Sequence, residues 1–506
     1  MKKLNAPQAR ILAILLSVAV ATLPDILTAG IPQVDRGTEI GAGNRVKDLS
    51  LTLARLDEEL GNLQKTNRTV GMSVGVVIDQ KLAWARGYGF ADLEHKIPAS
   101  SDSVYHIGSI TKMFTDTMLM QLRDQGKLSL DDPIEKHLPQ FRLRSRFADP
   151  RPPTFRQVAA HVAGIPREPG FITDSAGAPH VPSPEVMLSG LKDKEIMWAP
   201  VKEMHYSNLG VYLMGHALAH IAGEPYKDYV KAHILEPLGM HSSGWVYNDT
   251  MRAHRAILYE TVREDGGSRR HASEMDFSGG GAPGGGLNST VEDLARFISF
   301  QFREGAAGNK AVLGSTTVRE MWNPVYLSDD WSFGLGIGWW LNRTDGHLII
   351  GHGGSGPGCS AEVKFVPDLK FGVIVLMNEM NFTEGQVAHT MLRELIPVMG
   401  KPESKAAASV PFPQTATNYA GKYEGPGGWT TEIQSNGEKL VMLMGYAGRT
   451  LGGFDLEPID ASRFRIATGS LAKELVSFEQ TGDKPLRLDL WGLLFDRQET
   501  ESPTRR

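Results

Sequence analysis

The sequence predicts a mixed α/β (α+β) protein in which helices flank an antiparallel sheet, followed by a small all-β domain. Two observations support this prediction. Apolar, β-rich runs lie near both ends of the first 400 residues and helical patterns lie between them, whereas short alternating strands follow residue 413. The length of 506 residues exceeds the roughly 250 to 300 residues that one hydrophobic core supports. We therefore expect two folded units.

The first domain is predicted over residues 45–400. Leucines spaced along Val46–Lys65 favour an opening amphipathic helix. A hairpin follows, with strands Gly71–Ile78 and Leu82–Tyr88 around a polar turn. The domain closes with two more strands, Ala361–Val366 and Phe371–Met377.

The middle of this domain reads mainly as helix and loop. Ile110–Gln125 and Leu209–Ala222 have helical patterns, and each ends at a glycine, Gly126 or Gly223, which suits the C′ position. We expect a helical subdomain inserted into the sheet. The glycine-rich segment Gly279–Gly286 lacks the ending of a phosphate loop and is interpreted as a turn at the edge of a cleft.

Residues 1–29 are expected to be a secretory signal peptide. Basic residues precede the apolar stretch Ile11–Leu23, which contains the small-residue pattern Ala19-Val20-Ala21. This stretch is shorter than the roughly 20 residues that span a bilayer, so a permanent anchor is the weaker alternative. We therefore expect an exported protein, periplasmic or secreted, with no stable membrane span after processing.

The C-terminal part is predicted to be a linker at 401–413 and a small β domain at 414–500. The linker is rich in Pro, Ala, Ser and Lys. The expected strands are Thr430–Gln434, Lys439–Met444, Arg463–Ile466, Leu475–Glu479 and Leu486–Leu490.

Composition excludes some classes of function. A net charge of -5 offers no broad basic field, so nucleic acid is not expected as a partner. The single cysteine, Cys359, cannot form an internal disulfide or by itself a structural zinc site, and we interpret it as a buried small side chain. His216 and His220 have the spacing of a helical metal pair but lack the glutamate of a zincin, so we expect no metal and no cofactor.

Ser109 and Lys112 are the candidate nucleophile and its base. A serine hydroxyl needs a base within hydrogen-bond reach, and residues three apart share one face of a helix. The same spacing recurs at Ser189–Lys192 and Ser470–Lys473. Only the tetrad at Ser109 begins a long helix and is followed in order by Tyr206-Ser207-Asn208 and His352-Gly353-Gly354.

These motifs resemble the class C β-lactamase-like serine hydrolases, which include penicillin-binding peptidases, family VIII carboxylesterases and D-amino-acid-directed peptidases. The resemblance covers roughly residues 45–400 and implies a β-lactamase/transpeptidase-like fold. Further segments that carry it are Thr154–Pro166, Leu235–Met240, Ala282–Phe297 and Phe333–Trp339.

The resemblance also implies roles for individual residues. Ser109 would form an acyl-enzyme while Lys112 and Tyr206 move the proton, and which of these two is the base stays open. Asn208 and the strand segment His352, Gly353, Gly354 and Ser355 would bind the substrate. The backbone N–H groups of Ser109 and Ser355 would form the oxyanion hole.

We therefore expect a serine hydrolase that cleaves an amide or ester bond in a small molecule or short peptide. A class C-type β-lactamase is the first alternative. It is disfavoured because His352 stands where many β-lactamases have lysine, whose permanent cation suits a β-lactam carboxylate better. A penicillin-binding or scaffold protein with vestigial catalysis is the other alternative. Arg156 and His161 are interpreted as structural.

Overall fold

The structure is a computed structural model of the whole chain. It describes residues 42–147, 151–170, 172–173, 179–264, 267–272, 280–303, 306–307, 310–400, 412–446, 448–467, 474–480, 486–490 and 493–498. The expected signal peptide and residues 401–411 of the expected linker lie outside the described residues. The chain divides into two compact units near residue 401, and each is described by itself.

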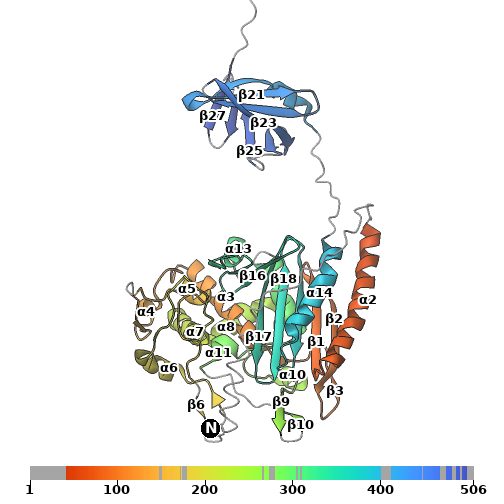
Figure 1. The fold of residues 1–506 in the computed structure, drawn as a ribbon, viewed down its shortest axis with the longest axis vertical. Helices are drawn as coiled ribbons and strands as arrows, with labels where there is room; N and C mark the ends of the chain where they lie inside the picture. The colour runs from red at the N-terminus through yellow and green to blue at the C-terminus, as the bar shows by residue number, and fades with distance from the viewer. Residues whose placement is uncertain are drawn as a thin grey trace, which may run out of the picture. The chain divides into compact units, whose positions relative to one another are not determined.

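A nine-stranded antiparallel sheet forms the centre of the first unit (Figure 1). In spatial order its strands are β14 (Tyr326–Leu327), β15 (Phe333–Leu335), β16 (Trp340–Thr344), β17 (His347–Gly356), β18 (Cys359–Val366), β19 (Phe371–Met377), β1 (Gly71–Ile78), β2 (Lys81–Asp92) and β3 (Ile97–Pro98). β1 pairs with β19 from Met72 opposite Met377 to Ile78 opposite Phe371. The first and last long strands of the unit are therefore neighbours, as an inserted middle region requires.

Alternating side chains give the sheet two apolar faces. Along β19, Val373 and Val375 belong to one buried cluster, whereas Ile374 and Leu376 belong to another. The first cluster is covered by α2 (Ala42–Thr66) and α14 (Glu384–Met399), which lie side by side in Figure 1. The second includes α12 (Val291–Phe302) and the helical region. The sheet is thus buried between two layers, which explains why its strands are apolar runs.

The helical region is organised around two long helices, α3 (Thr111–Asp124) and α7 (Asn208–Ala222). The shorter helices of the unit are α4 (Ile134–His137), α5 (Phe155–Ala159), α6 (Pro184–Gly190), α8 (Tyr226–Val230), α9 (Glu236–Leu238), α10 (Asp249–Ala253), α11 (Ala282–Gly285) and α13 (Ser315–Met321). Short strand pairs join these helices: β4 (Tyr105–His106) with β11 (Asn288–Ser289), β5 (Arg144–Ser145) with β8 (Glu195–Ile196), β6 (Ile172–Thr173) with β7 (Pro179–His180), β9 (Tyr259–Glu264) with β10 (Gly267–Ala272), and β12 (Ala306–Ala307) with β13 (Lys310–Ala311).

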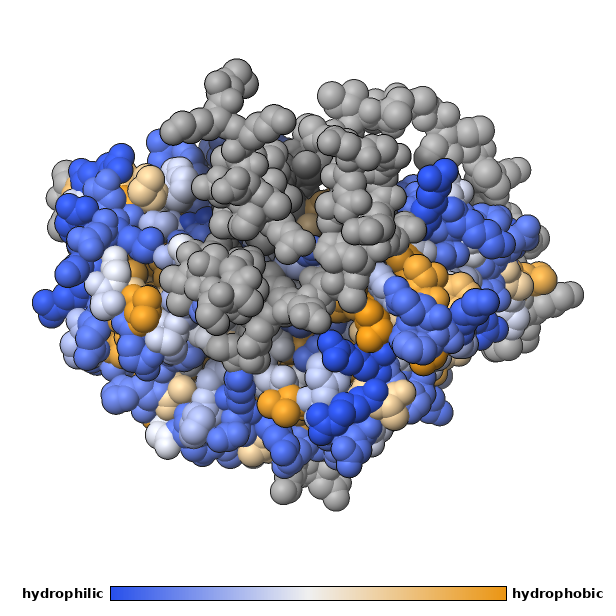
Figure 2. All heavy atoms as spheres, turned by 90° about the horizontal axis from the view of Figure 1, so that it is seen from below, coloured by the Kyte–Doolittle hydropathy of each residue, from blue (hydrophilic) through white to orange (hydrophobic). Residues whose placement is uncertain are grey.

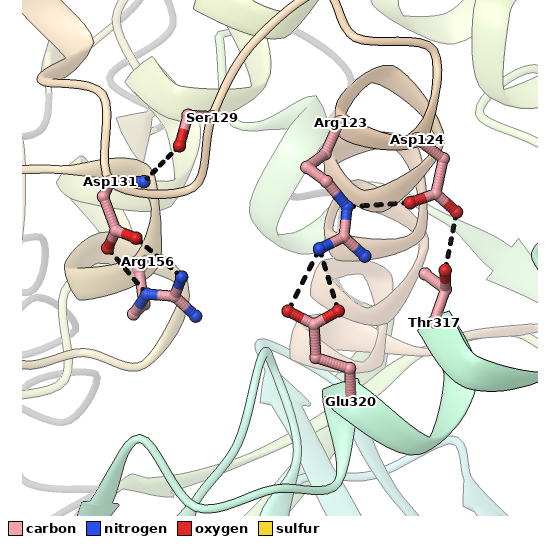
Figure 3. Close-up of polar contacts among 7 residues, drawn as sticks. All are labelled: Arg123, Asp124, Ser129, Asp131, Arg156, Thr317 and Glu320. Atoms are coloured by element: carbon pink, nitrogen blue, oxygen red, sulfur yellow. Dashed lines mark hydrogen bonds and ion pairs between the residues drawn. The ribbon is translucent and has the colours of Figure 1, made fainter.

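Ion pairs fix the outer end of α3 to its neighbours (Figure 3). Arg123 pairs with Glu320 at 2.8 Å, and the Thr317 hydroxyl donates to Asp124 at 2.6 Å, so α3 is joined to α13. Arg156 donates two hydrogen bonds to the Asp131 carboxylate, at 2.7 and 2.8 Å. These two contacts are consistent with the structural interpretation of Arg156.

The second unit is a closed barrel of eight antiparallel strands. They are β20 (Gly421–Glu424), β21 (Trp429–Ser435), β22 (Leu440–Tyr446), β23 (Arg449–Pro458), β24 (Arg463–Ile466), β25 (Leu475–Glu479), β26 (Arg487–Leu490) and β27 (Leu493–Arg497). β27 pairs with β20, with Tyr423 opposite Arg497, and this pairing closes the barrel. A separate apolar core that includes Tyr423, Phe464 and Phe478 fills its interior. The predicted small all-β domain is confirmed.

The surface seen in Figure 2 is mainly hydrophilic, and apolar side chains of described residues appear on it as small separate groups. Among the described helices, none has both the length and the apolar character needed to cross a bilayer.

A fragment ending at Gly400 is expected to fold without the barrel. The apolar clusters of the first unit contain no residue beyond Met399, and the barrel has its own cluster. Thermal unfolding of the fragment 43–400, followed by circular dichroism, should be cooperative, and the fragment should still react covalently at Ser109. An aggregated or non-cooperative fragment would show that the first unit needs the barrel to fold.

Candidate active site

Ser109 lies in a tight turn that leads directly into α3. The turn Gly108–Ile110 is a 3-10 helix, and Gly108 has a φ of +52°, in the left-handed region that favours glycine. The Thr111 hydroxyl donates to the Gly108 carbonyl at 2.7 Å and stabilises the turn. Ser109 is half-buried although both of its neighbours are buried, so the turn presents one accessible hydroxyl.

Lys112 is buried one helical turn from this hydroxyl. Its Nζ donates to Ser109 Oγ at 3.0 Å, to Asn208 Oδ1 at 2.8 Å and to the Gly284 carbonyl at 2.7 Å. The residue is 1% exposed, and this burial lowers the pKa of the amine to about 7, although the Glu168 and Asp116 carboxyls act in the opposite direction. An amine with this pKa exchanges a proton readily near neutral pH.

Tyr206 lies beside the same amine. Lys112 Nζ is 5.0 Å from the centroid of its ring, and Arg167 Cζ is also 5.0 Å from that centroid. Burial raises the pKa of the phenol, while Ser109 and Arg167 lower it. Among the described residues the buried hydroxyl has no hydrogen-bond partner of good geometry. A buried polar group without a partner is uncommon and therefore marks a candidate functional position.

The loop before Glu168 holds Tyr206 in place. His161, whose φ is +55°, accepts a hydrogen bond from the Ser207 N–H at Nδ1, at 3.2 Å, and the centroid of its ring lies 4.1 Å from that of the Tyr206 ring. The Ser207 hydroxyl donates to the Pro166 carbonyl at 2.8 Å. The Leu209 N–H donates to the Arg167 carbonyl at 3.1 Å. His161 is therefore a structural residue, as expected, but it supports the site directly.

β17 runs past the serine turn on the other side. A β-carbon at Gly108 would lie 2.6 Å from the backbone nitrogen of Ser355, and one at Gly354 would overlap the Ile107 carbonyl. The glycines therefore allow the two segments to approach closely. Gly353, Gly354 and Ser355 lie on β17, paired with Glu362, Ala361 and Ser360 of β18. The backbone nitrogens of Ser109 and Ser355, predicted as oxyanion donors, therefore lie on two segments in close contact.

His352 is buried and electrically neutral. Its Nδ1 lies 2.6 Å from the Gly353 carbonyl, which can only accept, so the proton is on Nδ1. Burial, reinforced by the nearby Lys112, lowers its pKa to about 3. Its Nε2 is an acceptor without a partner among the described residues. The ring lies 4.9 Å from that of Trp340 and 6.2 Å from that of Tyr206.

The structure therefore places Lys112, Asn208 and Tyr206 near the Ser109 hydroxyl. Gly354 and Ser355 of β17 lie against the serine turn, and the His352 ring lies near that of Tyr206. A family model described as Beta-lactamase matches residues 56–396. The chain belongs to the beta-lactamase family.

Two relatives are similar to this beta-lactamase-family chain over less than two thirds of their length. Beta-lactamase-like protein 2 of Dictyostelium discoideum is 31% identical over 326 residues, which are 63% of this chain and 58% of the relative. Protein flp of Staphylococcus aureus strain MW2 is 28% identical over 314 residues, 61% of this chain and 59% of the relative.

Two solved structures share the fold of this beta-lactamase-family protein. The octameric penicillin-binding protein homologue from Pyrococcus abyssi has a TM-score of 0.59 at 25% identity and covers 88% of this chain and 99% of its own. That share exceeds what residues 1–401 could supply, so it includes part of the barrel unit. The class C beta lactamase from Rhodobacter sphaeroides has a TM-score of 0.54 at 21% identity, covering 68% of this chain and 98% of its own.

Two residues of the site in this family member, Glu168 and Gly284, were not predicted from the sequence. Glu168 accepts from Asn208 Nδ2 at 2.8 Å, and the Gly284 carbonyl binds Lys112. Gly284 belongs to the glycine-rich segment interpreted as a cleft edge, and a β-carbon there would overlap the Tyr212 ring. Only the tertiary fold reveals these partners, because neither segment has a spacing that refers to Ser109.

Other sequence features have simple structural outcomes. Ser189 and Lys192 lie outside the site, in α6 and the 3-10 turn after it, and the Ser189 hydroxyl donates to the Val186 carbonyl at 2.9 Å. His216 Nε2 lies 3.1 Å from the Gly280 carbonyl. Within the described ranges, no group of three or more His, Cys, Asp or Glu residues could hold a metal ion. Cys359 is buried as predicted, but it lies 3.3 Å from His106 Nδ1, a pairing that the sequence did not indicate.

Proposed function

We propose that this protein is an exported serine hydrolase that cleaves an amide or ester bond of a small molecule or short peptide through an acyl-enzyme on Ser109. The observation that carries the proposal is the 3.0 Å hydrogen bond between the half-buried Ser109 hydroxyl and the buried Lys112 amine. A nucleophile and a base at this separation, with a phenol beside them, form the arrangement that acyl transfer needs. Export rests on the apolar segment Ile11–Leu23, outside the described residues.

The chemistry has two halves. Ser109 Oγ attacks the substrate carbonyl carbon while Lys112 or Tyr206 accepts its proton, and the negative oxygen of the tetrahedral intermediate is held by the N–H groups of Ser109 and Ser355. The intermediate collapses, and the leaving amine or alcohol takes the proton. Water then attacks the acyl-enzyme and releases the acid, with the same residues exchanging the proton in reverse order. Each oxyanion donor is worth about 3 kcal/mol in the transition state.

His352 supports an ester or peptide substrate over a β-lactam. A β-lactam carboxylate is favoured by a permanent cation, whereas a histidine whose pKa is about 3 carries no charge at neutral pH. Its free Nε2 instead offers an acceptor for a substrate N–H or O–H group.

Mass spectrometry of the intact protein tests the proposal. A fluorophosphonate should add one label at Ser109, and p-nitrophenyl esters or short peptides should be turned over faster than nitrocefin. Rapid nitrocefin turnover would favour the β-lactamase alternative. A β-lactam adduct that persists, without turnover of esters or peptides, would favour a penicillin-binding protein. Absence of any label at Ser109 would contradict the proposal.

A further inference from the structure

A chain of hydrogen bonds extends from the nucleophile to a carboxylate that no sequence motif identifies. Ser109 Oγ accepts from Lys112 Nζ at 3.0 Å, Lys112 Nζ donates to Asn208 Oδ1 at 2.8 Å, and Asn208 Nδ2 donates to Glu168 Oε1 at 2.8 Å. The Asn208 amide is thus held at both ends. Because an amide nitrogen can only donate and a carboxylate can only accept, Glu168 fixes which end of the amide faces the lysine.

Glu168 is a largely buried carboxylate and not a surface charge. Its side chain is only 12% exposed, and it lies in the loop that is bonded to the Tyr206 segment. A carboxylate in such a place is expensive to keep ionised unless hydrogen bonds and a cation compensate for lost hydration. Here Asn208 supplies the hydrogen bond, and Arg167 Nε lies 3.4 Å from the same Oε1 atom.

Arg167 contacts the other proton-handling residue. Its guanidinium lies over the Tyr206 ring, opposite in charge to the carboxylate next to it in sequence. Arg167 therefore contacts Tyr206 directly with a positive charge, whereas Glu168 is connected to Lys112 through Asn208 and carries a negative charge.

We propose that Glu168 is a positioning residue that orients Asn208 and thereby holds Lys112 against Ser109, and that the Arg167–Glu168 pair sets the charge balance of the Lys112–Tyr206 couple. The proposal rests on the proposed serine hydrolase function and deepens it. The two residues have opposite effects on the protonation of Lys112 and Tyr206. Glu168 favours the protonated amine and phenol, and Arg167 favours the deprotonated forms.

The other charged and titratable residues around the Lys112–Tyr206 couple are left unchanged in the variants that test the proposal. Those that interact with Lys112 or Tyr206 are Asp116 on α3, His161 in the supporting loop, Tyr212 on α7 and His352 on β17. The electrostatic effects of the pair agree with the proposal, because Glu168 raises and Arg167 lowers the pKa of both Lys112 and Tyr206.

Opposite substitutions in neighbouring residues provide the test. The rate of Ser109 acylation by a fluorophosphonate is measured against pH in wild type, Glu168→Gln, Arg167→Gln and the double variant. The part of the rate–pH profile that depends on the protonation of Lys112 and Tyr206 should move to lower pH in Glu168→Gln and to higher pH in Arg167→Gln. Each shift should be about half a pH unit to one pH unit. The double variant should return close to the wild-type profile. These directions hold whether Lys112 or Tyr206 is the base.

A second comparison isolates the positioning role. Glu168→Gln keeps an acceptor for Asn208 Nδ2, whereas Glu168→Ala removes it, so only the alanine variant should lose roughly 10-fold in the maximal acylation rate. Similar melting temperatures check that all variants fold. Profiles that coincide with wild type, or that move in the same direction for both single variants, would overturn the inference while leaving the serine hydrolase proposal intact. Failure of wild-type Ser109 to react would instead contradict the proposed function.

Discussion

Replacing Ser109 with alanine is expected to lower hydrolysis by at least about 10⁴-fold, the scale on which removing a serine nucleophile acts. Lys112 Nζ has three hydrogen-bond partners of the described residues, and Ser109 Oγ is the one hydroxyl among them. Among the described residues, no second serine or threonine hydroxyl is hydrogen-bonded to this amine and so placed to replace it. Steady-state kinetics with an ester or peptide substrate, together with the mass of the fluorophosphonate-treated protein, measure the effect.

The fold of the Ser109→Ala variant should remain intact. The side chain is half-buried, and its loss removes one hydrogen bond, which is worth about 1 kcal/mol. Ser189→Ala is the matched control, because Ser189 has the same spacing to Lys192 but donates to the Val186 carbonyl away from the site. That variant should keep full activity. Retained turnover in Ser109→Ala, or its loss in Ser189→Ala, would show that the nucleophile has been misassigned.

Local patterns predicted the strands at the two ends of the first unit closely. Gly71–Ile78 and Phe371–Met377 have the predicted bounds as β1 and β19, because each is a continuous apolar run buried on both faces. β2 extends to Asp92, beyond the predicted end at Tyr88, because its half-exposed residues lack such a run. The sequence shows how buried a segment is more clearly than where its pairing stops.

The closed barrel could not be predicted in the same way. β23 carries Gly452 and Gly453, which weaken its strand pattern, and β20 is only four residues long. Closure depends on the pairing of β20 with β27, more than seventy positions away along the chain. Such pairing is a property of the fold that neither short segment encodes by itself.

Some residues of the candidate site could be predicted from local patterns, and others could not. The Ser109–Lys112 contact follows from helical spacing, and the motifs around Tyr206 and His352 supply the rest of the predicted set. Glu168 and the Gly284 carbonyl enter only through tertiary contacts from loops. The reacting atoms were therefore predictable, whereas the groups that set their charge were not.

Lys112→Met is expected to give the second large loss of activity, about 10²-fold to 10⁴-fold in kcat/KM, the usual contribution of a positioned acid or base. Methionine has nearly the same length and is apolar, so the buried position stays filled. The loss should be measured in ester hydrolysis and in fluorophosphonate labelling of Ser109. Labelling at the wild-type rate would mean that Lys112 takes no part in activating the serine.

The same variant should reveal the energetic cost of the buried amine. Burial lowers the pKa of Lys112 to about 7 from an ordinary value of 10.5, so between these pH values the unfolded chain binds more protons than the folded one. The free energy of unfolding of wild type relative to Lys112→Met should therefore increase as the pH rises from about 7 to about 10, with a slope of at most about 1.4 kcal/mol per pH unit. Below pH 7 the difference should level off, because the amine is then charged in both the folded and the unfolded wild-type chain and its burial destabilises the folded state fully. Urea unfolding of both proteins across this range measures it, and a difference that stays flat would show that the amine titrates normally in the folded protein. A rising difference would mean that the site keeps its base reactive at the expense of stability, which is the trade-off expected where a charge is buried for catalysis.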